Sequence, residues 1–339
     1  MLVLGLESSC DDCSAAVVEE TSAGPKIISL VRESQDELHA PYGGVVPELA
    51  AREHLIKLRQ VIETALHQAG IKTTDLSIIA VTKGPGLIGC LLTTFSAGKA
   101  MAWHSDIAFA PIHHAMGHFN SARFDAPNLP FPALVLLVSG GHTHLYLASN
   151  WIDMQLLMKT RDDAAGEAFD KTARLLDLGY PGGQAVDERA QHATNSALAF
   201  RSPKFKDGLP SWSFSGLKTA VKQRIENTPG LSGDDRNESE INALCKRLNE
   251  TITTWLLEPI PKLATAYGAK SLVVSGGVAC NSELRSKAKS LSENLGIVVA
   301  IPKPYLCTDN GAMVASAGAM LPRSTHSSWM ENASADFKL

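Results

Sequence analysis

The sequence predicts an α/β fold, and two observations support this prediction. Short apolar runs that end in glycine-rich turns alternate with longer amphipathic segments, which is the order typical of strands followed by helices. A chain of 339 residues with 45% hydrophobic residues can bury a substantial core. This length is typical of about two domains.

The expected elements follow from the spacing of apolar residues along the chain. Short apolar runs beside turn residues are expected strands, and segments with apolar residues three or four apart are expected helices. Segments 202–212 and 228–237, rich in Pro, Gly, Ser and charge, are expected loops. The expected strands are 2–6, 14–18, 27–31, 78–82, 107–112, 133–138, 143–148, 271–275 and 297–301. The expected helices are 47–69, 88–103, 113–124, 163–177, 184–193, 215–226, 239–267, 281–294 and 310–320.

Composition limits the compartment and the partners. The longest apolar runs are far shorter than the roughly 20 residues that cross a bilayer, so we expect no membrane contact. An apolar strand directly after Met1 leaves no room for a targeting segment, and we expect a cytoplasmic protein with reduced cysteines. A formal charge of −4 argues against a stand-alone nucleic-acid binder. Any bound RNA must therefore rely on local basic patches or on a partner.

Two segments, 2–18 and 134–147, share the pattern of strand, small polar turn and strand. The first turn contains 7–12, and the second is Ser139-Gly140-Gly141 followed by His and Thr. Paired hairpins of this kind hold nucleotide phosphates in the actin, Hsp70 and sugar-kinase fold. The pattern alone favours two unrelated hairpins, because hairpins are common.

A third glycine-rich turn joins the expected strand 271–275 to the helix that starts near Asn281. Glycines let the backbone approach a ligand closely, and the first amides of a helix point at anionic or polar groups. Tight turns need glycine anyway, so one such turn is a weak signal. Segment 84–89 matches G-x-G-x-x-G, but the acidic residue of a dinucleotide site is missing about 20 positions later.

The clearest candidate for chemistry is the pair His114 and His118, four residues apart at the start of an expected helix. This spacing places both imidazoles on one face, where they can bind a metal. Asp309, at a strand-to-helix junction, is the best third ligand, although a helix N-cap is its ordinary alternative role. Two surface histidines are the alternative for the pair. A zinc-protease site is rejected, because Ala115 stands where that motif has its glutamate.

The expected helix 163–177 carries Asp170 and is followed by another backbone-exposing turn, which contains Gly183. A carboxylate facing such a turn suits the hydroxyl groups of a ribose. The alternative is an ordinary charged helix surface.

Taken together, these segments resemble the TsaD/YgjD family of transfer-RNA threonylcarbamoyltransferases over nearly the whole chain. So many matches in the same order make a chance resemblance very improbable. The matching stretches are 5–11, 42–50, 84–87, 113–114, 139–143, 163–172, 180–183, 213–219, 275–278 with Asn281, and 307–313.

The resemblance implies an actin/Hsp70/sugar-kinase-like (ASKHA) fold with two lobes around a nucleotide-binding cleft. It implies transfer of threonylcarbamoyl from threonylcarbamoyl-AMP to N6 of adenosine 37 in tRNAs that read ANN codons, with release of AMP and no covalent nucleophile. The implied metal ligands are His114, His118 and Asp309, for Fe(2+) or, as an alternative, Zn(2+). The implied substrate contacts are Leu137, Val138, Ser139, Gly140, Gly141, Asp170, Gly183 and Asn281.

The expected N-terminal lobe is 1–111, completed by a returning helix 309–321, and the expected C-terminal lobe is 112–308. The resemblance also implies partners beyond tRNA: a TsaB-like paralogue, a TsaE-like ATPase, and a TsaC-type enzyme that supplies the adenylate. We expect the paralogue to dock on the helix 47–69, and we expect RNA contacts from local basic patches. The candidate basic residues are Lys204, Lys206, Lys218, Lys222, Arg224, Lys246 and Arg247.

Two positions depart from the family pattern. Met116 stands where the family usually has Glu, and Asp12-Cys13 stands where it usually has Glu-Thr. The first departure raises the question of which carboxylate supports the histidines. Two other functions stay open at this point: an ATP-dependent kinase or ATPase of the same fold, and a scaffold without activity.

Overall fold

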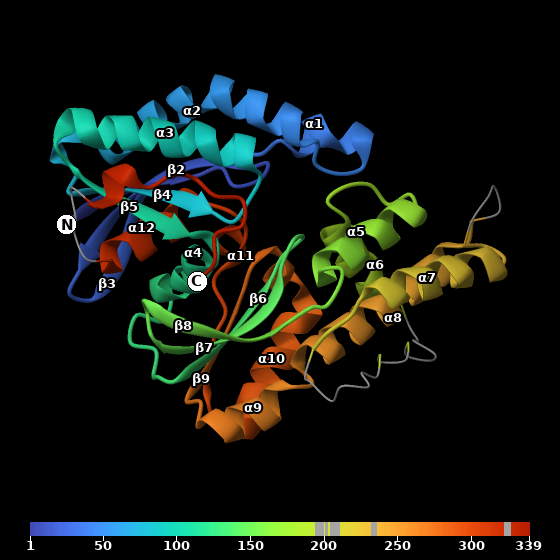
Figure 1. The fold of residues 1–339 in the computed structure, drawn as a ribbon. Coiled ribbons are helices and arrows are strands. Elements are labelled where there is room, and N and C mark those ends of the chain that lie inside the picture. Colours follow the sequence, from blue (N-terminus) through green and yellow to red (C-terminus); the bar gives the residue numbers. More distant parts are fainter. Residues whose placement is uncertain (194–199, 201–202, 204–210, 232–235, 322–326) are drawn as a thin grey trace. The chain divides into compact units, whose positions relative to one another are not determined.

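Two mixed five-stranded sheets organise the chain (Figure 1). The computed structural model describes residues 1–193, 200, 203, 211–231, 236–321 and 327–339. The first sheet has the order β3-β2-β1-β4-β5, and the second has the order β10-β9-β6-β7-β8. Read from β8 to β10 and numbered with β6 as its first strand, the second sheet has the strand order 3-2-1-4-5. This is the strand order of the first sheet. The interpretation of two unrelated hairpins, which the sequence pattern alone favoured, was therefore wrong.

The first sheet contains β1 (Leu2–Glu7), β2 (Cys13–Thr21), β3 (Gly24–Glu33), β4 (Ile78–Gly84) and β5 (Ala108–His113). The second contains β6 (Ala133–Val138), β7 (Thr143–Asn150), β8 (Asp153–Lys159), β9 (Ser271–Ser275) and β10 (Val298–Ala300). The helices of the first half are α1 (Asp36–His39), α2 (Pro47–Ala69), α3 (Ile88–Ser105) and α4 (His114–Asn120). The later helices are α5 (Ala165–Leu175), α6 (Gly182–Gln191), α7 (Ser215–Asn227), α8 (Glu238–Leu257), α9 (Ile260–Tyr267), α10 (Ser282–Leu295), α11 (Pro304–Cys307) and α12 (Gly311–Met320). Short 3₁₀ turns are η1 (Ala40–Tyr42), η2 (Thr73–Asp75), η3 (Ser121–Phe124), η4 (Gly277–Cys280) and η5 (Ser327–Met330).

The chain divides into two compact units. The first unit contains Met1–Leu129, Ala148–Met154 and Pro302–Leu339, and the second contains Pro130–Leu147 and Gln155–Ile301. Helix α4 and the residues around Asp309 thus belong to the same unit as the first sheet. The expected lobe boundaries, 1–111 with 309–321 and 112–308, stay a prediction.

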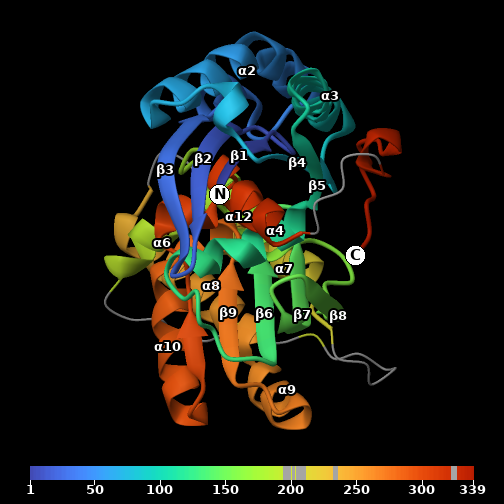
Figure 2. The ribbon, with the colours of Figure 1, turned by 90° about the vertical axis from the view of Figure 1, so that its left-hand side faces the viewer.

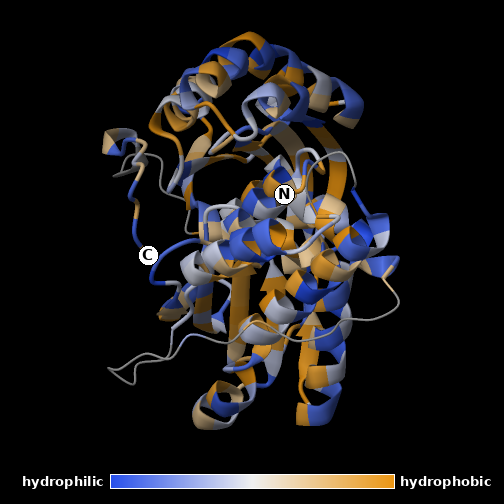
Figure 3. Ribbon diagram, turned by 90° about the vertical axis from the view of Figure 1, so that its right-hand side faces the viewer, coloured by the Kyte–Doolittle hydropathy of each residue, from blue (hydrophilic) through white to orange (hydrophobic). Residues whose placement is uncertain are grey.

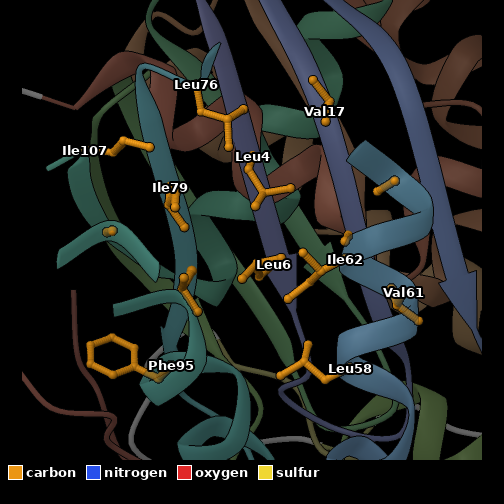
Figure 4. Packing of buried hydrophobic residues seen from close by; sticks show 14 of the residues in the cluster. Leu4, Leu6, Val17, Leu58, Val61, Ile62, Leu76, Ile79, Phe95 and Ile107 are labelled. Carbon is orange, nitrogen blue, oxygen red and sulfur yellow. The ribbon is translucent and has the colours of Figure 1, made fainter. Parts of the chain in front are cut away.

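Helices cover both faces of the first sheet. Helices α2 and α3 pack side by side against the sheet (Figure 2), and α12 packs against β1, β2 and β4. The apolar core beneath α2 and α3 includes Leu4, Leu6, Leu58 and Phe95, all buried (Figure 4). Coloured by hydropathy, the strands of both sheets are largely hydrophobic (Figure 3). Burial of these apolar side chains is the main stabilising contribution to this unit.

One close approach sets the position of α12. A Cβ on Gly5 of β1 would collide with the backbone of α12 at the Gly311 carbonyl, and a Cβ on Gly311 would crowd the Gly5 carbonyl. Only glycine allows the strand and the helix to touch backbone to backbone here. The segment just before α12 is thereby placed near the carboxyl end of β1, where Glu7 lies.

The predicted elements largely agree with the structure. Each predicted strand overlaps an observed strand, and 133–138 and 271–275 match in both bounds. The single helix predicted for 239–267 was wrong, because the chain breaks between α8 and α9 at Pro259, which cannot donate the helical hydrogen bond. Of the predicted loops 202–212 and 228–237, the parts that the structure describes contain neither helix nor longer strand, and the rest lies outside the described residues. Within the described ranges, none of the helices combines the length and apolar character that a membrane crossing requires.

Candidate metal centre and substrate-binding turns

The two candidate histidines lie on a short buried helix that follows directly from β5. Helix α4 has seven residues, all buried, and the side chain of His113 accepts a hydrogen bond from the Ala115 amide as its N-cap. The exposed fractions of His114 and His118 are 5% and 1%. Their ring centroids are 4.6 Å apart. The alternative of two surface histidines is excluded by this burial.

Asp309 reaches the same place from a distant part of the chain. Its Oδ1 lies 3.1 Å from His118 Nε2 and 3.6 Å from His114 Nε2. The N-cap of α12 is the next residue, Asn310, whose side chain accepts the Met313 amide. Asp309 is therefore not the helix cap that the sequence left open, and its carboxylate faces the histidines instead.

These three side chains form a donor set that fits a transition metal. One ligand atom from each of His114, His118 and Asp309 lies within 4.8 Å of the others. Two imidazole nitrogens and one carboxylate oxygen suit Fe(II), Zn(II) and related ions, whereas Mg²⁺ prefers oxygen ligands. The structure thus brings together all three metal ligands expected from the resemblance.

Glu7 is a buried residue beside the candidate centre that the sequence did not single out. Its carboxylate is fully buried at the end of β1, and Oε2 lies 3.4 Å from His114 Nδ1. The Ser9 amide donates to Glu7 Oε1, and the Thr82 hydroxyl donates to Oε2, each at 2.5 Å. Ser9 Oγ also lies 3.2 Å from His114 Nδ1. A carboxylate behind a metal-binding histidine fixes the orientation and tautomer of its ring.

Glu7 answers the question that Met116 raised. Met116 is itself buried within α4 and offers no carboxylate. The supporting carboxylate comes from β1, 107 positions earlier in the chain than His114. Only the folded sheet brings the two together, so the spacing of residues along α4 could not reveal it.

Charge and burial compete strongly at this centre. Burial lowers the pKa of His114, but the charge of Asp309 and the Glu7 hydrogen bond outweigh it and raise that pKa to about 9. Burial opposes ionisation of Glu7 and Asp309, yet the pKa of each carboxyl lies below its ordinary value because of the neighbouring histidines. In the metal-free protein His114 is therefore protonated at neutral pH, and its positive charge lies between the carboxylates of Glu7 and Asp309. The two negative charges favour any cation at this position.

The second departure from the family pattern, at Asp12, contacts the centre indirectly. Asp12 Oδ1 accepts a hydrogen bond from Arg32 Nε at 2.9 Å, and Arg32 Nη1 donates to the Thr308 hydroxyl at 2.5 Å. Burial raises the pKa of Asp12 to about 8, although the charge of Arg32 opposes the rise. Asp12 thus contacts, through Arg32, the residue that precedes Asp309.

The expected substrate residues lie in the second unit, around the carboxyl ends of two neighbouring strands. β6 and β9 are parallel, and Leu137 pairs with Ser275. The Ser139 amide donates to the His142 carbonyl at 2.8 Å, and the His142 amide donates to Ser139 Oγ at 3.1 Å, which closes the turn. Gly140 and Gly141 are exposed at its tip. The carboxyl ends of parallel strands are where α/β proteins bind ligands.

The backbones of three turns approach one another closely at this edge. A Cβ on Gly276, whose φ is 93°, would collide with the Val138 carbonyl, and a Cβ on Gly166 would lie 2.5 Å from the Ser139 carbonyl. The side chains of Leu137 and Val138 are buried in the sheet, so only their backbone can face a ligand. The turn after β6, the start of α5 and the turn after β9 therefore form one contiguous backbone surface.

Asp170 and Asn281 hold the starts of α6 and α10, and Gly183 lies in the first turn of α6. Asp170 Oδ1 accepts the Gly182 amide at 3.0 Å, at the start of α6, where Gly183 follows. Asn281 Oδ1 accepts the Leu284 amide as the N-cap of α10, and its Nδ2 donates to Asn249 Oδ1 at 2.6 Å. Asp170 is thus a cap as well as a candidate ribose ligand, which the view of a plain charged helix surface did not include.

The second unit also contains a cavity beside α6. It has a volume of about 590 Å³, and none of its lining residues was expected from the sequence to bind substrate. They come from the segment after α5, from α6 and the residue after it, and from the start of α8 and the segment before it: Asp177, Leu178, Ala185, Glu188, Arg189, His192, Arg236 and Glu238. Arg189 of its wall pairs with Glu238, and Arg236 pairs with Asp177. These four charged residues pair with one another, and we do not assign this cavity to the adenylate.

Comparison with solved structures defines the class of protein. Component A of (R)-2-hydroxyglutaryl-CoA dehydratase from Acidaminococcus fermentans superposes with a TM-score of 0.57 at 14% identity, over 94% of this chain and 97% of that chain. HypF from T. kodakarensis gives 0.61 at 13% identity, over 94% and 47%. At these identities the likeness establishes the fold alone. The chain is a protein of the ASKHA class, with a candidate metal centre of two histidines and an aspartate.

Comparison with sequences defines the family. The model of the TsaD family, tRNA N6-adenosine threonylcarbamoyltransferase, matches residues 26–316. Proteins described by the same name in Pelobacter propionicus and Geotalea uraniireducens are 44% and 45% identical, each over 94% of this chain and 91% and 90% of their own lengths. The chain belongs to the TsaD family. It is a transferase that forms N6-threonylcarbamoyladenosine at position 37 of tRNA, which confirms the family, fold and reaction expected from the sequence.

Proposed function

We propose that the transfer depends on a divalent metal held by His114, His118 and Asp309, with Fe(2+) favoured and Zn(2+) the alternative. The observation that carries this proposal is the convergence of three ligand atoms within 4.8 Å from segments almost 200 positions apart. A metal bound there would act as a Lewis acid toward phosphate or carbamoyl oxygens.

The residues around the ligands prepare them for this task. Glu7 accepts a hydrogen bond from the Nδ1–H group of His114, so with a metal bound the lone pair of Nε2 is on the side of Asp309. Thr82 and the Ser9 amide hold Glu7 in place from its other sides. Burial of α4 excludes water from the histidines and strengthens their electrostatic interactions.

The substrate contacts in our proposal are Leu137 to Gly141, Asp170, Gly183 and Asn281. Exposed amides at Gly140 and Gly141 suit phosphate or acyl oxygens, and the carboxylate of Asp170 suits a ribose hydroxyl. The close backbone approaches of the three turns support one common site for the adenylate.

The reaction needs no covalent nucleophile in this account. The adenylate is a mixed anhydride, so its carbamoyl carbon is already activated. A bond forms between that carbon and N6 of adenosine 37 while the bond to the phosphate oxygen breaks, AMP leaves with the electron pair, and N6 loses a proton. Orientation of the two reactants can supply much of the rate enhancement.

The exposed faces of α2 and α3 support docking of a TsaB-like paralogue. Leu55 and Ile56 of α2 are 68% and 70% exposed, and Ile88 and Leu92 of α3 are 46% and 47% exposed. The two helices meet where Gly89 faces Ala51, one turn away from these side chains. Adjacent exposed apolar side chains of this size are typical of a protein interface.

We also propose that a TsaE-like ATPase and a TsaC-type enzyme act with this chain in the cytoplasm, the latter supplying threonylcarbamoyl-AMP. Among the basic residues suggested for RNA contacts, Lys218 pairs with Asp163 and Lys222 lies 3.8 Å from Glu226, which weakens their candidacy. Lys204 and Lys206 lie outside the described residues.

A reconstituted transfer assay tests the metal proposal. The chain and its partners are incubated with threonylcarbamoyl-AMP and tRNA, and the modified nucleoside is measured by mass spectrometry. We expect the His114→Ala/His118→Ala variant to fold, to bind no metal and to transfer nothing. Full transfer by this variant in a demonstrably metal-free state would overturn the proposal.

A further inference from the structure

Part of the C-terminal segment, Trp329–Phe337, packs against the first sheet of its own unit (Figure 2). The Trp329 ring stacks on Phe109 of β5, with centroids 5.8 Å apart and planes 10° apart. Glu331 forms an ion pair with Lys83 at 2.5 Å, and its carbonyl accepts a hydrogen bond from Lys99. The first half of the segment is thus held by ring stacking and by charge.

The second half follows the turn after β4 toward α4. The Ser334 amide donates to the Lys83 carbonyl at 2.9 Å, and the Gly86 amide donates to the Ala335 carbonyl at 3.3 Å. Gly84 has a φ of 152°, and a Cβ there would overlap the Ser334 carbonyl. Glycine at position 84 therefore permits this contact twice over, through its backbone conformation and through its missing side chain.

The segment ends on the residue that caps the metal helix. His113 Nε2 lies 3.0 Å from the Phe337 carbonyl, and His113 Nδ1 accepts the Ala115 amide at 3.1 Å. Since Nδ1 accepts, the ring proton is on Nε2 and is donated to Phe337. The Phe337 carbonyl thus selects the tautomer in which His113 can cap α4.

The His113 cap is important for the stability of α4, because α4 is short. The helix has seven residues, and it begins with His114 and contains His118. A helix of this length has few internal hydrogen bonds, so the cap contributes a large share of its local order. Greater backbone mobility at Ala115 would also displace the adjacent ligand, His114.

We propose that the segment Trp329–Phe337 is a positioning element of the metal centre, which acts through the Phe337 carbonyl and His113 on the helix that carries His114 and His118. The inference rests on the metal site of the proposed function. A purely structural role, in which the segment only covers apolar surface, would depend on Trp329 instead of Phe337.

The test separates these roles by shortening the chain after Ala335. This variant keeps Trp329, Glu331 and the Ala335 oxygen that accepts the Gly86 amide. It loses the Phe337 carbonyl that contacts His113, together with the Phe337 ring, which lies over Lys83 and beside the His113 ring. We expect it to bind Zn²⁺ about 10-fold more weakly in competition with a chelator, as for other losses of a partner behind a metal ligand. Hydrogen exchange at the Ala115 amide should accelerate, while the unfolding midpoint changes little.

Two further variants identify the group responsible. Phe337→Ala keeps the carbonyl and removes the ring that lies over Lys83, and we expect its Zn²⁺ affinity to stay within about threefold of the parent. His113→Asn supplies a cap that needs no partner to set its tautomer, so shortening the chain should cost His113→Asn less than about twofold.

Equal Zn²⁺ affinity of the parent and shortened chains, or an equal loss in the His113→Asn background, would overturn the inference. A loss in Phe337→Ala as large as in the shortened chain would assign the effect to the ring and would also overturn it. The proposed metal site fails separately, if His114→Ala/His118→Ala binds Zn²⁺ like the parent.

Discussion

Replacing Glu7 with Gln tests how the buried carboxylate prepares His114. Glutamine has nearly the same shape, so the oxygen that accepts the Ser9 amide can be kept. The new NH₂ group then takes the place of Oε2 and faces the Thr82 hydroxyl and His114 Nδ1. The hydroxyl can turn and accept, but Nδ1 must also accept, which moves the ring proton to Nε2. That nitrogen is the one on the side of Asp309.

The size of the effect follows from the contact that is lost. A hydrogen bond to a buried charged group is worth roughly 1.5–3 kcal/mol, and each 1.4 kcal/mol corresponds to a factor of about ten. We therefore expect Glu7→Gln to bind Zn²⁺ about 10- to 100-fold more weakly, in line with other carboxylates behind metal-binding histidines.

Competition with a chromophoric chelator at fixed pH measures this change. Glu63→Gln is the matched control, because Glu63 is exposed on α2 and pairs only with Arg59 among the ion pairs that the structure describes for it. The control should stay within about twofold of the parent, given the small contribution of exposed pairs. An unchanged affinity in Glu7→Gln would refute the tautomer argument.

Three further changes have expected outcomes. Asp170→Ala should lower the free energy of unfolding by about 1 kcal/mol, because it removes the cap on α6, and calorimetry with a stable adenylate analogue should show weaker binding; unchanged adenylate affinity would leave Asp170 as a cap only. Zn²⁺ affinity should rise about tenfold per pH unit up to about pH 9 and then level off, because the metal must displace the proton of His114, whose pKa is raised to about 9; a flat profile would contradict this. By the same shift, the contribution of His114 to the stability of the metal-free chain is complete below its ordinary pKa near 6.5 and is lost as the pH rises through 9. Leu55→Glu should fold with an unchanged melting temperature and lose binding to the TsaB-like paralogue, as measured by co-purification; retained binding would refute α2 as the docking surface.

Local patterns in the sequence predicted those parts of the fold that depend on local periodicity. The two histidines on one helix face and the strands with continuous apolar runs are examples. Strand β8 was not predicted, because Met154 and Met158 are its only buried side chains and its remaining residues are polar, half-buried or, like Leu156, exposed. β8 holds the position in the second sheet that β3 holds in the first, and this repeated strand order is a signal that could have revealed it.

The parts of the site that could not be predicted depend on contacts between distant segments. Glu7, Thr82 and His114 meet only because β1 and β4 are neighbours and β5 leads into α4. The role of Asp309 was open until the structure showed that Asn310 caps α12. Nothing in the spacing of residues linked Phe337 to His113, since a backbone carbonyl leaves no mark in the sequence.

The metal dependence of the transfer is the central claim, and one measurement tests it most directly. The chain is stripped of metal, and formation of N6-threonylcarbamoyladenosine from threonylcarbamoyl-AMP and tRNA is followed as Fe²⁺ or Zn²⁺ is added back, for the parent and for Asp309→Ala. We predict that the parent regains activity with one metal per chain and that Asp309→Ala, which lacks the carboxylate 3.1 Å from His118, does not. Full transfer by the stripped parent, or by Asp309→Ala without bound metal, would contradict the account.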